Sequence, residues 1–339
     1  MKTVAYLALA GFLTMTLGCS SALKVADFKE LACDKKECDI APPDYIVSKK
    51  KPRVAILNIE DTTEFEGKLS KPAVETLSQA ISHGFGIEVV ERGQVNQLFK
   101  EAKFSETLGL DTDFSKLTNV AKDIDFVLVG SIPSASVGAK YTAPSSYVDK
   151  KGKTHYIAAS CNVSGASVVN IRVISTATGT VSKVFKPFKG SASGSSEVPN
   201  SSSCNVGNPL ATATLAVTKA IENGKDDLHD AFPNYGYISK TLTNPQDNKS
   251  RIAYISLGKN DGVKIGDKLI IAKYVKSYDK IKKIETTSVM DLADSYIDIT
   301  GFSDNESIVK IPEDISDQVV AGYIVKTAAD RSFMKNIMK

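Results

Sequence analysis

The chain has few of the residues that build catalytic and metal sites. Its 339 residues include only three histidines, and no two of His83, His155 and His229 have the spacing of metal ligands or of a catalytic triad. It has no Gly-x-x-x-x-Gly-Lys-Ser/Thr phosphate loop, and the glycines from 258 to 266 lack the strand-to-helix setting of a dinucleotide-binding motif. We therefore expect no enzyme activity, no cofactor and no metal.

Two further patterns fall short of a site. The segment from Gly190 to Gly194 has the outline of a nucleophile elbow, but its central residue is Ala192. An acidic group after the first predicted strand could hold a cation, but turn-forming polar residues adjoin each carboxylate, which favours a solvated loop. This group consists of Glu60, Asp61, Glu64 and Glu66.

Neither positive nor negative residues form a long consecutive block. The chain has 42 basic and 39 acidic residues and a formal net charge of +3, and its longest basic block is Lys49-Lys50-Lys51. Binding to nucleic acid usually needs a concentrated basic face. We therefore expect no nucleic-acid partner.

Long hydrophobic runs are also scarce, and the main one lies at the start of the chain. Lys2 precedes a mostly apolar segment, 4–15, which ends in Thr16-Leu17-Gly18-Cys19. About 12 apolar residues are too few to cross a bilayer, which needs about 20. The pattern is typical of a bacterial lipoprotein signal peptide over 1–18, with lipid on Cys19. An ordinary secretory signal with a stray cysteine is the alternative.

The remaining cysteines fit an oxidising compartment. Once Cys19 is assigned to lipid, four are left, and Cys33 with Cys38 would close a small loop. Cys161 would then pair with Cys204. A zinc knuckle at Cys33 and Cys38 is the alternative, although no histidine or second close cysteine pair lies nearby.

Periodicity and turn signals divide the rest of the chain. We predict a lipidated tether over 19–51, an α/β domain over 52–235, a small β domain over 236–327 and a basic tail over 328–339. In the α/β domain, helices are expected at 70–83, 93–103, 113–122 and 208–232, between strands such as 54–59 and 125–130. The serine-rich segment 191–203 is expected to be a flexible loop or extension. Short strands in 251–256, 268–272 and 319–325 indicate a small barrel or sandwich.

Four motifs in this order resemble the CsgG-like family of bacterial envelope lipoproteins. They lie at 54–61, 91–98, 125–132 and 169–179, and the resemblance covers about residues 52 to 232. It implies a three-layer α/β fold similar to anticodon-binding and TolB N-terminal domains. The turn from Ser256 to Asp267 resembles that of SH3-like barrels, and a CsgG-like domain followed by such a barrel resembles the FlgT family of flagellar assembly proteins.

The resemblance implies a role without catalysis. We expect a lipoprotein on the periplasmic side of the outer membrane, because Ser20 follows the cysteine where an aspartate would retain the protein in the inner membrane. Its expected partners are further copies of itself in a ring, the membrane through its lipid, and components of a secretion or flagellar machine. Arg92, Asn170 and Arg172 are candidate subunit or partner contacts.

Two other functions remain open at this stage. The first is a CsgG-type secretion pore, for which regions 131–167 and 188–207 would supply the membrane hairpins, although neither shows a clear apolar alternation. The second is a periplasmic lipoprotein that binds and activates a cell-wall synthase.

Overall fold

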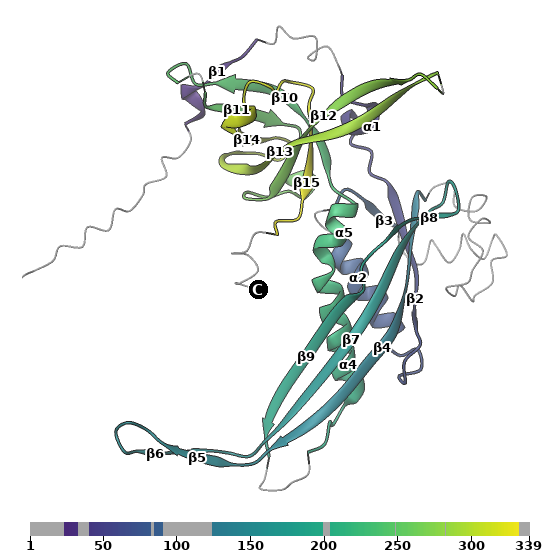
Figure 1. The fold of residues 1–339 in the computed structure, drawn as a ribbon, viewed down its shortest axis with the longest axis vertical. Coiled ribbons are helices and arrows are strands. Elements are labelled where there is room, and N and C mark those ends of the chain that lie inside the picture. Colours follow the sequence, from purple (N-terminus) through teal and green to yellow (C-terminus); the bar gives the residue numbers. More distant parts are fainter. Residues whose placement is uncertain are drawn as a thin grey trace, which may run out of the picture.

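The computed structural model describes residues 24–32, 41–82, 85–90, 124–198, 204–247, 249–281 and 283–331. They form two large sheets, each with its own hydrophobic core, and a separate two-stranded ribbon (Figure 1). The helices predicted at 93–103 and 113–122 lie outside the described residues. None of the described helices has the length and apolarity needed to span a bilayer.

The first sheet is mixed. Its strands are β2 (Arg53–Asp61), β3 (Glu88–Val90), β4 (Phe126–Thr142), β7 (Ser160–Ser175), β8 (Thr180–Val184) and β9 (Phe188–Glu197). β2 lies between β3 and β4 and is parallel to both, whereas β7 is antiparallel to β4, β8 and β9. A strand between parallel neighbours is usually buried on both faces, which explains why the start of β2 is a continuous apolar run.

Helices cover one face of this sheet. They are α2 (Ser70–Ile81), α4 (Pro209–Asn223) and α5 (Lys225–Ala231). The predicted start of the last long helix is confirmed, because the Asn208 side chain accepts a hydrogen bond from the Ala211 amide at 3.0 Å and Pro209 occupies the first turn. The helix does not run unbroken to residue 232, since α4 ends at Gly224 and α5 begins there.

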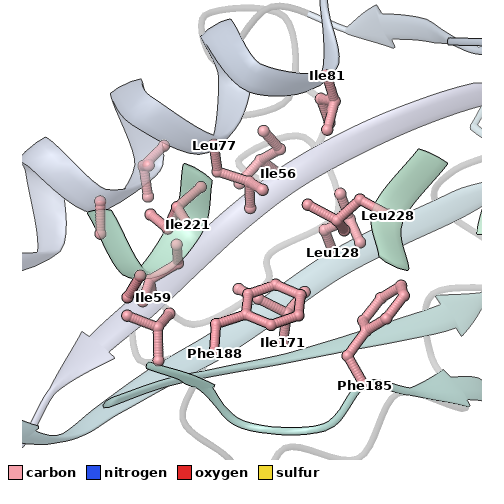
Figure 2. Packing of buried hydrophobic residues seen from close by; sticks show 14 of the residues in the cluster. Ile56, Ile59, Leu77, Ile81, Leu128, Ile171, Phe185, Phe188, Ile221 and Leu228 are labelled. Atoms are coloured by element: carbon pink, nitrogen blue, oxygen red, sulfur yellow. The ribbon is translucent and has the colours of Figure 1, made fainter. Parts of the chain in front are cut away.

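The core of this unit lies between the helices and the sheet. In Figure 2, Leu77 and Ile81 of α2 and Ile221 of α4 point toward Ile56 of β2 and Leu128 of β4. The three-layer α/β fold implied by the resemblance is not supported: all the described helices of this unit pack on the same face, and the described chain is mostly β-sheet. The apolar stripe of each helix faces this one core.

The prediction of a flexible loop over 191–203 is wrong for the first part of this segment, which is a strand. Residues up to Glu197 belong to β9, which pairs with β7 from Phe188↔Val169 to Glu197↔Ser160. α4 packs on this strand so closely that a Cβ atom on Gly190 would lie 2.1 Å from the Ala216 carbonyl oxygen. The small residues that suggest a loop are therefore what the helix contact requires.

The second sheet closes into a six-stranded antiparallel barrel, so the predicted β-barrel domain is present. Its strands are β10 (Tyr235–Thr243), β11 (Arg251–Ile255), β12 (Lys268–Asp279), β13 (Ile284–Phe302), β14 (Ser307–Ile311) and β15 (Ile324–Ala328). The order is β10-β11-β14-β13-β12-β15, and β15 pairs with β10 to close the ring. Short 3₁₀ turns occur at Lys259–Asp261 and Glu313–Ile315, and Gly262 ends the first with a φ of 79°.

Much of the predicted tether packs on this barrel. A 3₁₀ turn, Val25–Asp27, leads into β1 (Lys29–Glu30), which pairs with β10, and Phe28 packs beside Leu242 and Ile252. Farther along, α1 (Asp44–Val47) buries Ile46 against the barrel. The described parts of 19–51 are thus bound to the fold.

Two β-ribbons project from the molecule. One is β5 (Ser145–Val148) paired with β6 (Thr154–Ile157), at the far end of the β4–β7 hairpin (Figure 1). The other is the outer part of the β12–β13 hairpin, which extends beyond the barrel. Residues 149–152 form the turn between β5 and β6.

Candidate functional site

A cleft of about 580 Å³ lies where the two units meet, and the segment before β2 forms one of its walls. α1 holds this segment in place, because Ile46 is 1% exposed and packs against Ala272 and Ile324 of the barrel. The Tyr45 and Tyr274 hydroxyl groups are 2.9 Å apart, within hydrogen-bond distance. The residues that follow α1 are therefore fixed beside the barrel.

The linker between the two units, residues 231–235, forms hydrogen bonds with both of them. Asn234 is 2% exposed. Its backbone N–H donates to the Thr327 hydroxyl at 2.9 Å, and its backbone carbonyl accepts from the backbone N–H of Thr327 at 3.0 Å. On the other side, the Gly86 amide donates to the Phe232 carbonyl at 3.0 Å. A Cβ atom on Gly86 would lie 2.0 Å from the Pro233 carbonyl oxygen, so only glycine fits there. The cleft floor is therefore a rigid junction.

The side chains that line the cleft come from four parts of the chain. The segment before β2 contributes Tyr45 and residues 49–52, the first sheet contributes Phe126 and Val173 with residues 175–177, the linker contributes residues 231–235, and the barrel contributes Leu257 and Asp261. Most of the cleft surface is apolar, and lysine and aspartate side chains add polar groups to it. Such a mixture of apolar wall and few polar groups is typical of ligand or peptide sites.

Both carboxylates in the cleft already have structural partners. One Asp261 oxygen accepts from the Gly258 amide at 2.9 Å and from the Lys49 ammonium at 2.8 Å. Asp125 accepts from the Arg53 amide at 2.7 Å. These bonds fix a turn and a strand end, so neither group is placed as a general base. Asp261 lies within the turn that the sequence indicates between Ser256 and Asp267.

The cleft is left with an excess of positive charge. Lys50, Lys51 and Lys183 also line it, and Lys50 and Lys183 are exposed. With both carboxylates engaged, these ammonium groups are available to an anionic group such as a carboxylate or phosphate. Lys50 and Lys51 were noticed in the sequence only as part of its longest basic block. No signal in the sequence places that block beside Asp261, 212 residues away.

Tyr45 and Tyr235 line the cleft, and Tyr274 of the barrel contacts Tyr45. Burial raises the pKa of Tyr235, and burial followed by the hydrogen bond to Tyr45 raises the pKa of Tyr274. The rings of Tyr45 and Tyr235 meet edge to face with centroids 6.3 Å apart. Tyr235 and Tyr274 therefore contact Tyr45 from two sides and hold α1 in place. Among the described residues, no group of three or more His, Cys, Asp or Glu side chains could hold a metal ion.

Among the described residues, the structure brings together one pair of the predicted site residues. Cys161 and Cys204 form the predicted disulfide, with their Cα atoms 5.4 Å apart. Cys19, Cys33, Cys38 and Arg92 lie outside the described residues. The first three concern the lipid and the second disulfide, which therefore stay predictions.

The two remaining candidate contacts lie on β7. Asn170 is opposite Ser131 of β4 and Arg172 is opposite Val129, on the face that alternates with the helix-covered core. Both side chains are half-buried, and the Arg172 Nη2 atom is buried with no hydrogen-bond partner among the described residues. Neither residue lines the cleft. Their proposed role as subunit contacts stays a prediction.

The acidic group after β2 is occupied by its own loop. Asp61 accepts hydrogen bonds from the Thr63 amide and hydroxyl and from the Leu69 amide, at 2.6 to 3.1 Å. This arrangement shapes the turn that leads into α2. Asp61 therefore has a structural role in this turn.

The sequence matches no family model and no curated protein. The fold is weakly similar to several solved bacterial structures. The LpoB C-terminal domain from Salmonella enterica is 14% identical, with 42% of this chain and 82% of that chain covered and a TM-score of 0.25. Lipoprotein GNA1162 from Neisseria meningitidis is 13% identical over 46% and 86%, with a TM-score of 0.25. A PelC dodecamer from Paraburkholderia phytofirmans is 14% identical over 51% and 88%, also with a TM-score of 0.25.

Proposed function

We propose that this protein is a lipoprotein anchored to the periplasmic side of the outer membrane, without enzyme activity, that assembles with copies of itself into a ring or scaffold. The scaffold would serve a secretion system or the assembly of a flagellar or other surface structure. The lipoprotein signal supports the location. The sheet extension built from β4, β7 and β9 carries the proposal of self-assembly.

This extension has two different open edges among the described strands. β4 pairs with β2 only as far as Ile132, so residues 133–142 have no strand on that side. Pro133, which lacks an N–H group, stands where this pairing ends. On the other side of β7, β9 is also an edge strand. Open edges favour pairing with another chain, and two unlike edges favour the head-to-tail contacts that generate rings.

The ribbon at the end of the extension adds an apolar surface. Tyr147, Val148, Tyr156 and Ile157 are between 51% and 69% exposed. A two-stranded ribbon is marginally stable alone in water, and large apolar side chains on both of its faces make cover by another surface favourable. A neighbouring copy in a ring would supply that cover.

Sedimentation velocity of the lipidated protein in detergent tests self-assembly. We expect a defined oligomer at micromolar concentration, and a shift to smaller species when Val148→Ser and Tyr156→Ser are combined. Leu215→Ser removes a side chain that is similarly exposed, at 58%, on α4 and should leave the oligomer intact. A monomer at micromolar concentration would remove the proposal.

The anchor is tested separately. We expect the parent protein to incorporate radiolabelled palmitate and to be recovered in the outer-membrane fraction. Cys19→Ser should lose both properties. A protein that carries no label but remains in the periplasm would indicate an ordinary secretory signal.

The CsgG-type pore has less support from the geometry. Residues of both hairpin regions lie in the sheet beneath α4: a Cβ atom on Gly165 would lie 3.0 Å from the Thr212 side chain, and Gly190 lies against Ala216. Strands covered by a helix of their own chain are committed to its core. Conductance across planar bilayers tests this alternative, and we expect none.

The cleft favours a second candidate, a binding lipoprotein that contacts a periplasmic partner such as a cell-wall synthase. Its lysines would receive an acidic group of that partner. Deletion of the gene separates the two candidates: lost motility or surface structures with normal cell shape supports the scaffold, and altered cell shape with normal motility supports the binding lipoprotein.

A further inference from the structure

The outer part of the β12–β13 hairpin extends beyond the contacts that close the barrel. β15 pairs with β12 only from Lys268 to Ala272, whereas β12 and β13 remain paired out to Asp279↔Ile284. We call residues 273–290 the basic arm. Its paired strands have seven residues each, which corresponds to about 23 Å of ribbon. Figure 1 shows the arm pointing away from the rest of the fold.

The apex of the basic arm presents an apolar side chain. Ile281 is 93% exposed, the largest exposed fraction among the large apolar side chains of the described residues. The turn that carries it contains a hydrogen bond, in which an Asp279 carboxylate oxygen accepts from the Ile281 amide at 2.9 Å. Ile284 is 48% exposed and Tyr278 is 58% exposed, so apolar surface continues behind the apex.

Positive charge is concentrated on the same arm. Its sequence contains five lysines, one aspartate and one glutamate, a net charge of +3, which equals the formal net charge of the whole chain. The rest of the protein is therefore neutral in sum. Lys280 and Lys283 are exposed on either side of Ile281, and Asp279 is already engaged in the turn.

The shape of the apex decides between a rigid and a fluid partner. A protein interface of ordinary size buries about 800 Å² on each partner, which a narrow convex tip does not offer. A bilayer surface deforms around such a tip. An inserted aliphatic side chain, a tyrosine at headgroup depth and lysines near anionic headgroups are the combination that favours the membrane interface.

We propose that the basic arm binds an anionic phospholipid surface, with Ile281 inserted among the acyl chains and Lys280 and Lys283 at the headgroups. This contact is distinct from the lipid on Cys19 and does not depend on the proposed scaffold role. It gives the protein a second attachment to membrane, through the barrel.

Cosedimentation with vesicles tests the proposal on the chain purified without residues 1–19, so that no lipid is attached. We expect binding to an equal mixture of phosphatidylglycerol and phosphatidylcholine, little binding to phosphatidylcholine alone, and weaker binding as salt is raised. Combining Lys280→Gln with Lys283→Gln should weaken binding about 25-fold, or about fivefold for each lysine. Ile281→Ser should weaken it about tenfold.

Two control variants make the same chemical changes elsewhere. Lys150→Gln with Lys151→Gln removes two exposed lysines from the other hairpin tip, and Ile265→Ser removes an isoleucine that is 43% exposed outside the arm. Both should bind as the parent protein does. Equal losses in the arm and control variants would overturn the proposal, as would the absence of binding to the anionic vesicles.

Insertion has its own readout because the chain contains no tryptophan. Ile281→Trp would place the single tryptophan of the variant at the apex. With tryptophan excited selectively, we expect its emission to shift to the blue with anionic vesicles. Ile265→Trp should show no shift. Binding without a shift of the Ile281→Trp emission would refute insertion of the apex. Circular dichroism checks that each variant is folded.

Discussion

Alanine substitutions at Gly190 and Gly194 are expected to change stability in opposite directions, although the two glycines lie on the same strand. A Cβ atom on Gly190 would lie 2.1 Å from the Ala216 carbonyl oxygen and 2.2 Å from the Ala220 amide nitrogen, which are backbone atoms of α4. A Cβ atom on Gly194 would have no heavy atom within 4 Å. Comparing the two variants therefore separates the effect of the contact with α4 on stability from the general effect of replacing glycine by alanine in this strand.

The magnitudes follow from these distances. Carbon and its neighbours pack at about 3.5 Å, so Gly190→Ala forces α4 and β9 apart by more than about 1 Å. Overpacking of this kind costs about 1–3 kcal/mol or more. Gly194→Ala keeps its contacts and restricts the unfolded chain, which stabilises by about 0.4–1 kcal/mol. The free energies of unfolding of the two variants should thus differ by at least about 1.5 kcal/mol.

Urea unfolding followed by circular dichroism measures this difference, with the disulfide intact in both variants. If the two free energies agree within about 0.5 kcal/mol, the reasoning is refuted. That result would mean that α4 does not rest on β9 and that residues 191–203 form the flexible loop suggested by their composition.

Two further predictions concern the disulfide and the hairpin tip. Cys161→Ser should lower the free energy of unfolding by about 4 kcal/mol in the chain-entropy estimate, because Cys204 lies 43 residues away. A variant with the same urea midpoint as the parent with its disulfide intact would contradict this. At the tip, a hydrogen bond from His155, followed by one from the Lys153 amide, lowers the pKa of Asp149. The stabilisation is therefore present above the ordinary pKa of 3.8 and lost as the pH falls through the lower folded value. The protection factor of the Lys153 amide, which corrects for the intrinsic pH dependence of exchange, should fall over that range in the parent and show no such step in Asp149→Asn.

The elements that sequence alone predicted have local causes. α2 was expected from an apolar stripe with helical spacing, and its buried residues Val74, Leu77 and Ile81 follow that stripe. The start of α4 was expected because asparagine and proline have position-specific roles at a helix N-terminus. Interactions between near neighbours determine both features, so they can be read from a few consecutive residues.

The features that sequence reasoning missed depend on distant partners. β9 is rich in serine and glycine, which have low strand propensity, and it becomes a strand because β7 and α4 require small residues there. The segment before β2 holds single apolar residues, such as Phe28 and Ile46, without periodicity. Their burial requires a barrel that begins about 190 residues later. The cleft was missed for the same reason, because its walls come from segments that lie far apart in the sequence and that no local pattern connects.

The junction between the units bears on the proposed scaffold role. The exposed ion pairs of Arg331 with Asp227 and Asp230, both at 2.7 Å, contribute little to stability, because such pairs are worth about 0–1 kcal/mol. The buried bonds between Asn234 and Thr327 are harder to break, since an unpaired buried amide costs about 1–3 kcal/mol. Together with the burial of α1, these bonds favour motion of the two units as one body. The β5–β6 ribbon and the basic arm lie at opposite ends of the molecule in Figure 1, so a rigid junction would keep a fixed distance between a contact with neighbouring copies and a contact with membrane.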